Sequence, residues 1–147
     1  MNASHPIVDV TDTCACGTIS LRLNGPVLSM LLCSCRQCQK ATGTGHAAVA
    51  LVNATSTTLT GTPATFARPA DSGALLTQHF CATCRTHIYA QSSRAPEIHL
   101  IPVGFFAGNA AWFVPNQLIF ARSHQEWDIL PDHLPQHETY PMRPPRG

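Results

Sequence analysis

The sequence of 147 residues predicts a mainly β fold in a single domain. Short apolar segments alternate with polar residues at the period of a half-buried strand, and turns containing Gly and Pro separate these segments. No long segment repeats its apolar residues at the helical period of 3.6. We therefore expect short strands joined by tight turns, with little helix.

The expected elements follow one another at short spacing. A strand over 18–23 alternates Ile, Leu and Leu with polar residues and ends at the turn signal Asn24-Gly25-Pro26, which an apolar run over 27–32 follows. Residues 35–41 are compatible with a short helix that Thr42-Gly43 would end. Further strands are expected over 46–52, 57–60, 75–80, 88–91, 98–103, 112–114 and 118–120, and one helical turn over 127–130. The domain core would cover about residues 10–134, and the Pro-rich tail over 135–147 would wrap the surface or be disordered.

Composition excludes several classes of protein. Hydrophobic residues make up 44% of the chain and charged residues 12%, which argues against disorder. The formal net charge is +1 and basic residues form no run, so no nucleic-acid partner is expected. No apolar window approaches the ~18 residues of a membrane span. Residues 1–12 lack a basic and an apolar signal region, so we expect a cytoplasmic protein.

Seven clustered cysteines are the strongest chemical signal in the chain: Cys14, Cys16, Cys33, Cys35, Cys38, Cys81 and Cys84. Without a secretion signal, such spacing is typical of metal binding or redox chemistry rather than disulfides. A disulfide within either Cys-x-Cys pair would close a strained ring.

Four of these thiols match a closed structural zinc site, which needs four soft ligands. Cys81-x-x-Cys84 is a zinc-knuckle pair, and Cys14-x-Cys16 is its natural partner. Such a site would close a long loop, where a metal clip restricts the unfolded chain most.

The remaining thiols, Cys33, Cys35 and Cys38, can reach one ion from local backbone alone. They would form a second zinc site with an open position, unless a histidine or a partner chain closes it. The alternative is that they are ordinary buried cysteines. Zinc held by three thiolates would be a weaker Lewis acid than zinc held by three neutral imidazoles, but it would hold an exchangeable thiol well. Thiol chemistry on an electrophile is therefore expected.

Catalysis at an open site needs a proton acceptor. His46 is the nearest histidine in sequence, although an incidental strand histidine is the alternative interpretation. His87 is a weaker candidate, and His79 is expected to be structural. Arg36 lies within the Cys-x-Cys-x-x-Cys loop and could attract a carboxylate, or remain solvated.

The chain resembles the glutathione-dependent formaldehyde-activating enzyme family (GFA, or CENP-V/GFA domain) over residues 14 to about 134. The resemblance rests on Cys14-x-Cys16-Gly17, on Cys33-Ser34-Cys35-Arg36-Gln37-Cys38 with Thr42-Gly43, and on Phe80-Cys81-x-x-Cys84. Weaker matches are Gly104-x-Phe106 and the spacing of Pro115, Ser123 and Trp127. The chain departs from the family pattern at Arg85, Ala107 and Leu118, where Gly, an acidic residue and His are usual.

The resemblance implies an Mss4-like fold of several small antiparallel sheets around a structural zinc at Cys14, Cys16, Cys81 and Cys84. It implies a second, catalytic zinc at Cys33, Cys35 and Cys38, near which glutathione acts, and leaves open whether that zinc is permanent or arrives with the thiol. The implied activity is that of a carbon–sulfur lyase resembling S-(hydroxymethyl)glutathione synthase, acting on a thiol adduct of formaldehyde or another small electrophile.

A competing hypothesis makes the chain a non-catalytic zinc-binding scaffold or a glutathione carrier. Phe105, Phe106, Trp112 and Phe113 could then form an exposed patch, or instead belong to the core or a homodimer interface. An open three-thiolate site favours the enzyme, whereas closure by a fourth ligand favours the scaffold.

Overall fold

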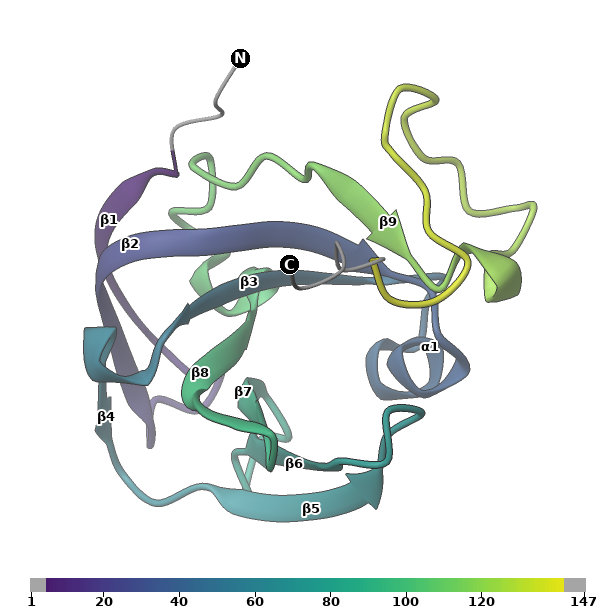
Figure 1. Cartoon of the computed structure of the whole chain (residues 1–147). Helices are drawn as coiled ribbons and strands as arrows, with labels where there is room; N and C mark the ends of the chain where they lie inside the picture. The colour runs from purple at the N-terminus through teal and green to yellow at the C-terminus, as the bar shows by residue number, and fades with distance from the viewer. Residues whose placement is uncertain (1–4, 142–147) are drawn as a thin grey trace, which may run out of the picture. The chain divides into compact units, whose positions relative to one another are not determined.

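The computed structural model describes residues 5–141 and is mainly β with largely antiparallel pairing, which confirms the predicted fold class (Figure 1). Residues 142–147 of the predicted tail lie outside the described residues. The strands are β1 (Ile7–Thr13), β2 (Ser20–Cys33), β3 (Ala47–Asn53), β4 (Thr57–Thr60), β5 (Ala64–Pro69), β6 (Leu75–Phe80), β7 (His87–Ser92), β8 (Ala95–Pro102) and β9 (Gln117–Ile119). The helical segments are α1 (Arg36–Thr42) and the 3-10 turns η1 (Ala54–Ser56), η2 (Val103–Phe106) and η3 (Ala121–Ser123).

The described chain divides into two compact units, the first made of residues 5–29 and 50–113. In this unit β1 pairs antiparallel with β2, and β4 pairs antiparallel with the start of β2. The strands β5, β6, β7 and β8 form an antiparallel meander. Apolar side chains from these strands, from β3, from η2 and from the residue before β2 are fully buried, which supplies the free energy that holds the unit together. They include Ile19, Leu21, Leu23, Val27, Val52, Ile88, Ile101 and Phe106.

The predicted turn at Asn24-Gly25-Pro26 is wrong, because β2 runs through it as one continuous strand. The unpredicted strand β1 pairs along this whole segment, with Ile7 opposite Pro26 and Thr13 opposite Ser20. Two features within the strand favour glycine at position 25: its φ is 155°, and a Cβ there would lie 2.4 Å from the Ser56 Oγ and 3.0 Å from the Ser56 Cβ. A glycine inside a strand commonly marks such a close approach.

Three other local predictions differ from the structure. The strand β5 was not expected, because its sequence carries no apolar alternation. The expected strand over 112–114 is absent; Trp112 lies in a turn and its Nε1 donates to the Asn109 carbonyl at 2.8 Å. The expected helical turn over 127–130 is a tight turn, closed by the Asp128 N–H donating to the Gln125 carbonyl at 3.0 Å.

The second unit consists of residues 30–49 and the described residues from 114 to 141. Here the end of β2 pairs in parallel with β9, with Cys33 opposite Ile119. The Pro-rich segment runs along β9: Leu118 exchanges hydrogen bonds with Pro135 and His137, each at 2.9 Å. The described residues 135–141 of the tail therefore pack along β9 in this unit.

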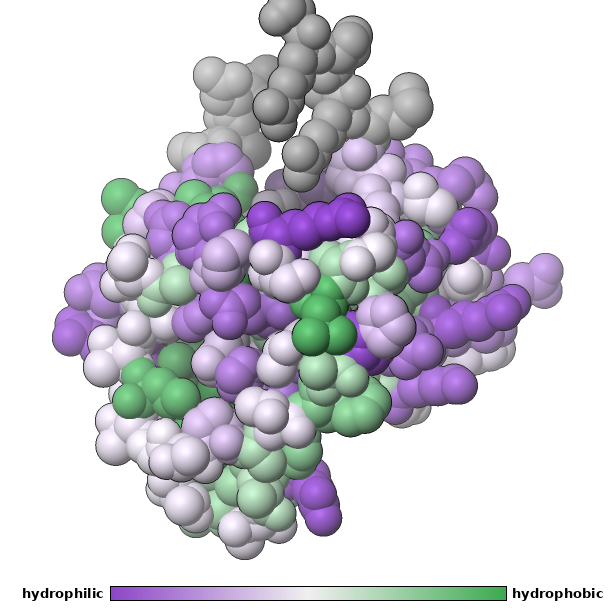
Figure 2. Space-filling view, turned by 60° about the horizontal axis from the view of Figure 1, so that its bottom comes forward, coloured by the Kyte–Doolittle hydropathy of each residue, from purple (hydrophilic) through white to green (hydrophobic). Residues whose placement is uncertain are grey.

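Exposed large apolar side chains are dispersed along the chain, and on the face drawn in Figure 2 hydrophobic residues stand as separate spots among hydrophilic ones. They include Ile7, Phe66, Leu75, Val114, Trp127, Ile129 and Tyr140. Scattered apolar residues of this kind are normal on a protein surface. Within residues 5–141, no helix is both long and apolar enough to cross a bilayer.

Candidate metal centres

Two hairpin turns of the first unit bring four cysteines together. Cys14 and Cys16 follow β1, whereas Cys81 and Cys84 lie between β6 and β7, and all four Sγ atoms lie within 4.8 Å of one another. The Cys16 Sγ lies 3.6 Å from that of Cys14 and 3.7 Å from that of Cys81. Tetrahedral zinc with bonds of about 2.3 Å separates its sulfurs by about 3.8 Å, so these thiols could hold that ion.

Hydrogen bonds to the sulfurs favour the thiolates that a metal requires. The Thr86 Oγ1 lies 3.2 Å from the Cys84 Sγ, and this hydroxyl lowers the pKa of the Cys84 thiol to about 5. The Thr18 hydroxyl, 2.9 Å from the Cys16 Sγ, likewise lowers the pKa of Cys16. The Ile19 N–H donates to the Cys14 Sγ at 3.3 Å. Such outer contacts orient metal ligands and stabilise their charged form.

Arg85, one of the departures from the family pattern, occupies a backbone position suited to glycine. Its φ is 68°, in the left-handed region, and its N–H donates to the Cys81 carbonyl at 2.9 Å. A side chain in this conformation costs roughly 1–2 kcal/mol relative to ordinary backbone. The knuckle keeps its shape despite this cost, so Arg85 leaves the four-cysteine geometry intact.

The end of β2 and the start of α1 bring Cys33, Cys35 and Cys38 together in the second unit, again with all Sγ atoms within 4.8 Å. Cys35 is the N-cap of α1, and its Sγ accepts from the Cys38 N–H at 3.3 Å. Gly43 ends the helix in the left-handed conformation, with φ 73°. A short, capped helix thus presents two of the three thiols to one point.

Crowding among these thiols makes Cys33 and Cys38 hard to ionise without a cation. Hydrogen bonding with Cys35 raises the pKa of Cys33 to about 12, and hydrogen bonding with Cys33 raises that of Cys38. A divalent cation reverses this effect, because it compensates the charge of several thiolates at once. Among residues 5–141, no further Cys, His, Asp or Glu belongs to the group. The donor set therefore fits a soft metal with one position left open.

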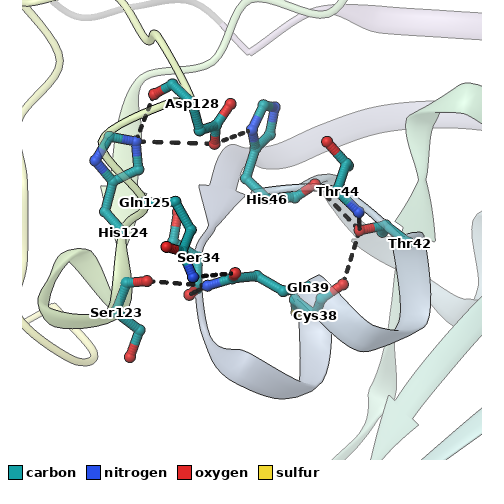
Figure 3. Close-up of polar contacts among 10 residues, drawn as sticks. All are labelled: Ser34, Cys38, Gln39, Thr42, Thr44, His46, Ser123, His124, Gln125 and Asp128. Atoms are coloured by element: carbon teal, nitrogen blue, oxygen red, sulfur yellow. Dashed lines mark hydrogen bonds and ion pairs between the residues drawn. The ribbon is translucent and has the colours of Figure 1, made fainter.

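Asp128 holds His46 in the second unit (Figure 3). The His46 Nδ1 lies 2.8 Å from the Asp128 Oδ2, and the two side chains are 26% and 11% exposed. The His124 Nε2 lies 2.7 Å from the Asp128 carbonyl and 3.8 Å from its Oδ2. Sequence reasoning missed Asp128, because it lies 82 residues from His46 and no local pattern marks it.

Gln39 on α1 links the helix to the chain segment that carries His124 and Asp128. Its Nε2 donates to the carbonyls of Ser34 at 2.8 Å and Ser123 at 2.9 Å. Its Oε1 accepts from the Gln125 Nε2 at 3.1 Å, as Figure 3 shows. Side chains that join distant segments in this way hold a site on a rigid element.

The other candidate residues have simpler surroundings. The His79 ring stacks on Tyr89 at 4.0 Å between centroids, and burial lowers the pKa of His79, as expected of a structural histidine. Arg36 is exposed on α1. Phe105 is 6% and Phe106 0% exposed, so these two residues do not form the exposed patch of the scaffold hypothesis. Leu118, where the family usually has His, is buried in β9.

Comparisons with known proteins agree with the cysteine pattern. A family model described as glutathione-dependent formaldehyde-activating enzyme matches residues 9–123. The crystal structure of a Rhodobacter sphaeroides protein, a structural-genomics target, is similar with a TM-score of 0.54 and 18% sequence identity. That likeness covers 68% of this chain and 90% of the other, and it concerns the fold alone. None of the curated proteins compared with the chain matches it.

Proposed function

Because this chain belongs to the glutathione-dependent formaldehyde-activating enzyme family, we propose that it is a zinc-dependent enzyme of the carbon–sulfur lyase type. Its substrates would be a small thiol such as glutathione and a small aldehyde such as formaldehyde, joined in a reversible addition. The single observation that carries this proposal is the three-thiol group of Cys33, Cys35 and Cys38, to which no fourth ligand within residues 5–141 belongs.

Cys14, Cys16, Cys81 and Cys84 would hold a structural zinc, and Cys33, Cys35 and Cys38 a second one. Zinc held by the three thiols would supply a centre that favours the ionised form of an incoming thiol near neutral pH. The open position favours an enzyme over a closed scaffold site.

The polypeptide contributes binding and orientation around that position. The cap at Cys35 and the left-handed Gly43 fix both ends of α1, so the thiols stay in place while the substrate exchanges. Arg36, exposed on the first turn of the same helix, would attract a carboxylate of glutathione.

The test is to follow the exchange of carbon-13 formaldehyde with glutathione by NMR, with and without the zinc-loaded protein. Native mass spectra of the same samples count zinc and bound glutathione. We expect two zincs per chain, a glutathione adduct and a faster exchange that is proportional to protein concentration. Binding of glutathione without faster exchange would instead support the carrier hypothesis.

The informative variant is Cys35→Ser, because serine is itself a good N-cap and preserves the start of α1. We expect one zinc per chain, loss of the rate enhancement by at least ~10²-fold, and an unchanged far-ultraviolet circular dichroism spectrum. Unfolding of this variant would show that the three-thiol group is structural. Gln37→Ser, on an exposed neighbouring position of the same helix, serves as the matched control.

A further inference from the structure

We propose that His46 and Asp128 form a dyad in which Asp128 is a positioning residue and the His46 Nε2 is the proton acceptor of the addition. This inference rests on the proposed function, since it assigns the group that moves a proton at the same site. It adds a residue, Asp128, to which neither the cysteine pattern nor the family match over residues 9–123 points.

The hydrogen bonds determine which nitrogen of His46 is free. The Asp128 carboxylate accepts at 2.8 Å, so the His46 Nδ1 carries the hydrogen that it donates. The Nε2 of a neutral ring then keeps its lone pair. This is the arrangement in which a buried carboxylate makes histidine an oriented general base.

The surroundings hold the carboxylate in place. A backbone carbonyl can only accept, so the His124 Nε2–H donates to the Asp128 carbonyl at 2.7 Å. The Asp128 N–H also donates to the Gln125 carbonyl at 3.0 Å, which closes a turn. Gly45 leaves room for the carboxylate, because a Cβ at Gly45 would lie 2.5 Å from the Asp128 Oδ2. Gly45 therefore provides the space for the Asp128 carboxylate, and the next residue, His46, is its hydrogen-bond partner.

The dyad lies beside the C-terminal end of α1, the helix that carries Cys38, where the Thr42 Oγ1 lies 3.5 Å from the His46 carbonyl. The turn of residues 43–46 joins α1 to β3, and the Thr42 Oγ1 donates to the Cys38 carbonyl at 2.8 Å. Figure 3 shows His46 next to this end of the helix, with its second ring nitrogen directed away from Asp128. Together with the Gln39 contacts, this attaches the Asp128 segment to α1.

The proposed step is balanced without an oxidant or reductant. The thiol S–H bond breaks and its proton passes to the His46 Nε2, while the sulfur electron pair forms the C–S bond to the aldehyde carbon. The carbonyl π pair moves to oxygen, which takes the proton back from the imidazolium. The product is a neutral hydroxymethyl thioether, and reversal of the step releases thiol and aldehyde.

The test compares Asp128→Asn with wild type, using the nearly isosteric amide to preserve packing against Gly45. Nitrogen-15 NMR of labelled histidine reports the His46 tautomer, and we expect Nδ1–H in wild type and loss of that preference in the variant. We expect kcat to fall at least ~10²-fold with KM for glutathione within ~3-fold and an unchanged zinc count. The control is Asp132→Asn, an exposed aspartate of the same segment, which should change none of these quantities.

The outcomes separate the dyad from the proposed function. An Nε2–H tautomer of His46 in the wild-type protein overturns the dyad, even if the variant fails to fold. So does full kcat in a folded Asp128→Asn variant. If the wild-type protein shows no exchange activity with glutathione and formaldehyde, the proposed function fails, while the tautomer measurement still decides whether Asp128 orients His46.

Discussion

At the scale of single residues, Thr86 connects the two hairpin turns of the four-cysteine group. Its Oγ1 accepts the Ala15 N–H at 3.1 Å, so its own hydroxyl hydrogen is free for the Cys84 sulfur at 3.2 Å. One hydroxyl thereby joins the Cys14–Cys16 turn to the knuckle and stabilises a thiolate. It is the largest cause of the low pKa of Cys84.

We predict that Thr86→Val moves the release of zinc to higher pH. The low pKa of the Cys84 thiol, about 5, favours its ionised form, so at this ligand protons compete less with the metal than they do at an ordinary thiol. Without the hydroxyl the pKa rises toward its ordinary value, and protons displace the metal earlier. Zinc release against pH, followed with a chromogenic chelator, measures the midpoint. Thr83→Val, an exposed threonine in the same knuckle, should leave the midpoint unchanged.

At the scale of elements, β9 and the Pro-rich segment depend on each other. The strand has only three residues, which pair with β2 on one side. On the other side Leu118 and Phe120 bond to Pro135, His137 and Thr139, and the Tyr140 ring meets Phe120 edge-on at 4.9 Å. Prolines cannot donate, but their carbonyls still accept, so the segment covers a strand edge that would otherwise be open.

Leu134 anchors this segment, with only 6% of its surface exposed. We predict that Leu134→Ala lowers the free energy of unfolding by about 2–4 kcal/mol, since it leaves a cavity. Ile129→Ala removes a similar side chain that is 86% exposed, and should change stability by less than about 0.5 kcal/mol. Urea denaturation of both variants provides the comparison. Equal effects would mean that the segment does not contribute to the folded core.

At the scale of the whole molecule, a metal in the four-cysteine group would connect segments that lie far apart in the sequence. Its Cys16–Cys81 contact joins residues 65 positions apart, all within the first unit. The three-cysteine group covers only residues 33–38, around the start of α1 in the second unit. A metal at the first group therefore restricts the unfolded chain far more than one at the second.

We predict that Cys81→Ser lowers the free energy of unfolding by roughly 3 kcal/mol or more, whereas Cys35→Ser has a much smaller effect.

Because β2 and β3 each contribute residues to both units, we also expect one cooperative unfolding transition, as the single-domain prediction requires. Calorimetry and fluorescence of the zinc-loaded proteins measure both quantities. Two separate transitions in wild type would contradict the single domain.

The sequence alone was sufficient for features that depend on local spacing. Alternating polarity and frequent Gly and Pro turns determine a mainly β fold, and they located most strands. The close spacing of Cys33, Cys35 and Cys38, and of Cys81 and Cys84, places each set within reach of one point, because a few residues of backbone cannot separate them widely. The family resemblance rests on the same spacings, and the family match agrees with it.

Only the tertiary structure decided what depends on distant contacts. Asn24-Gly25-Pro26 has the composition of a turn, yet pairing with β1 keeps it extended. Asp128 carries no local signal, because its partner lies 82 residues away and its space is created by Gly45. The local sequence pattern indicates which conformation a segment prefers by itself. The conformation at Gly25 and the role of Asp128 depend instead on residues that are distant in the sequence and become neighbours only in the folded chain.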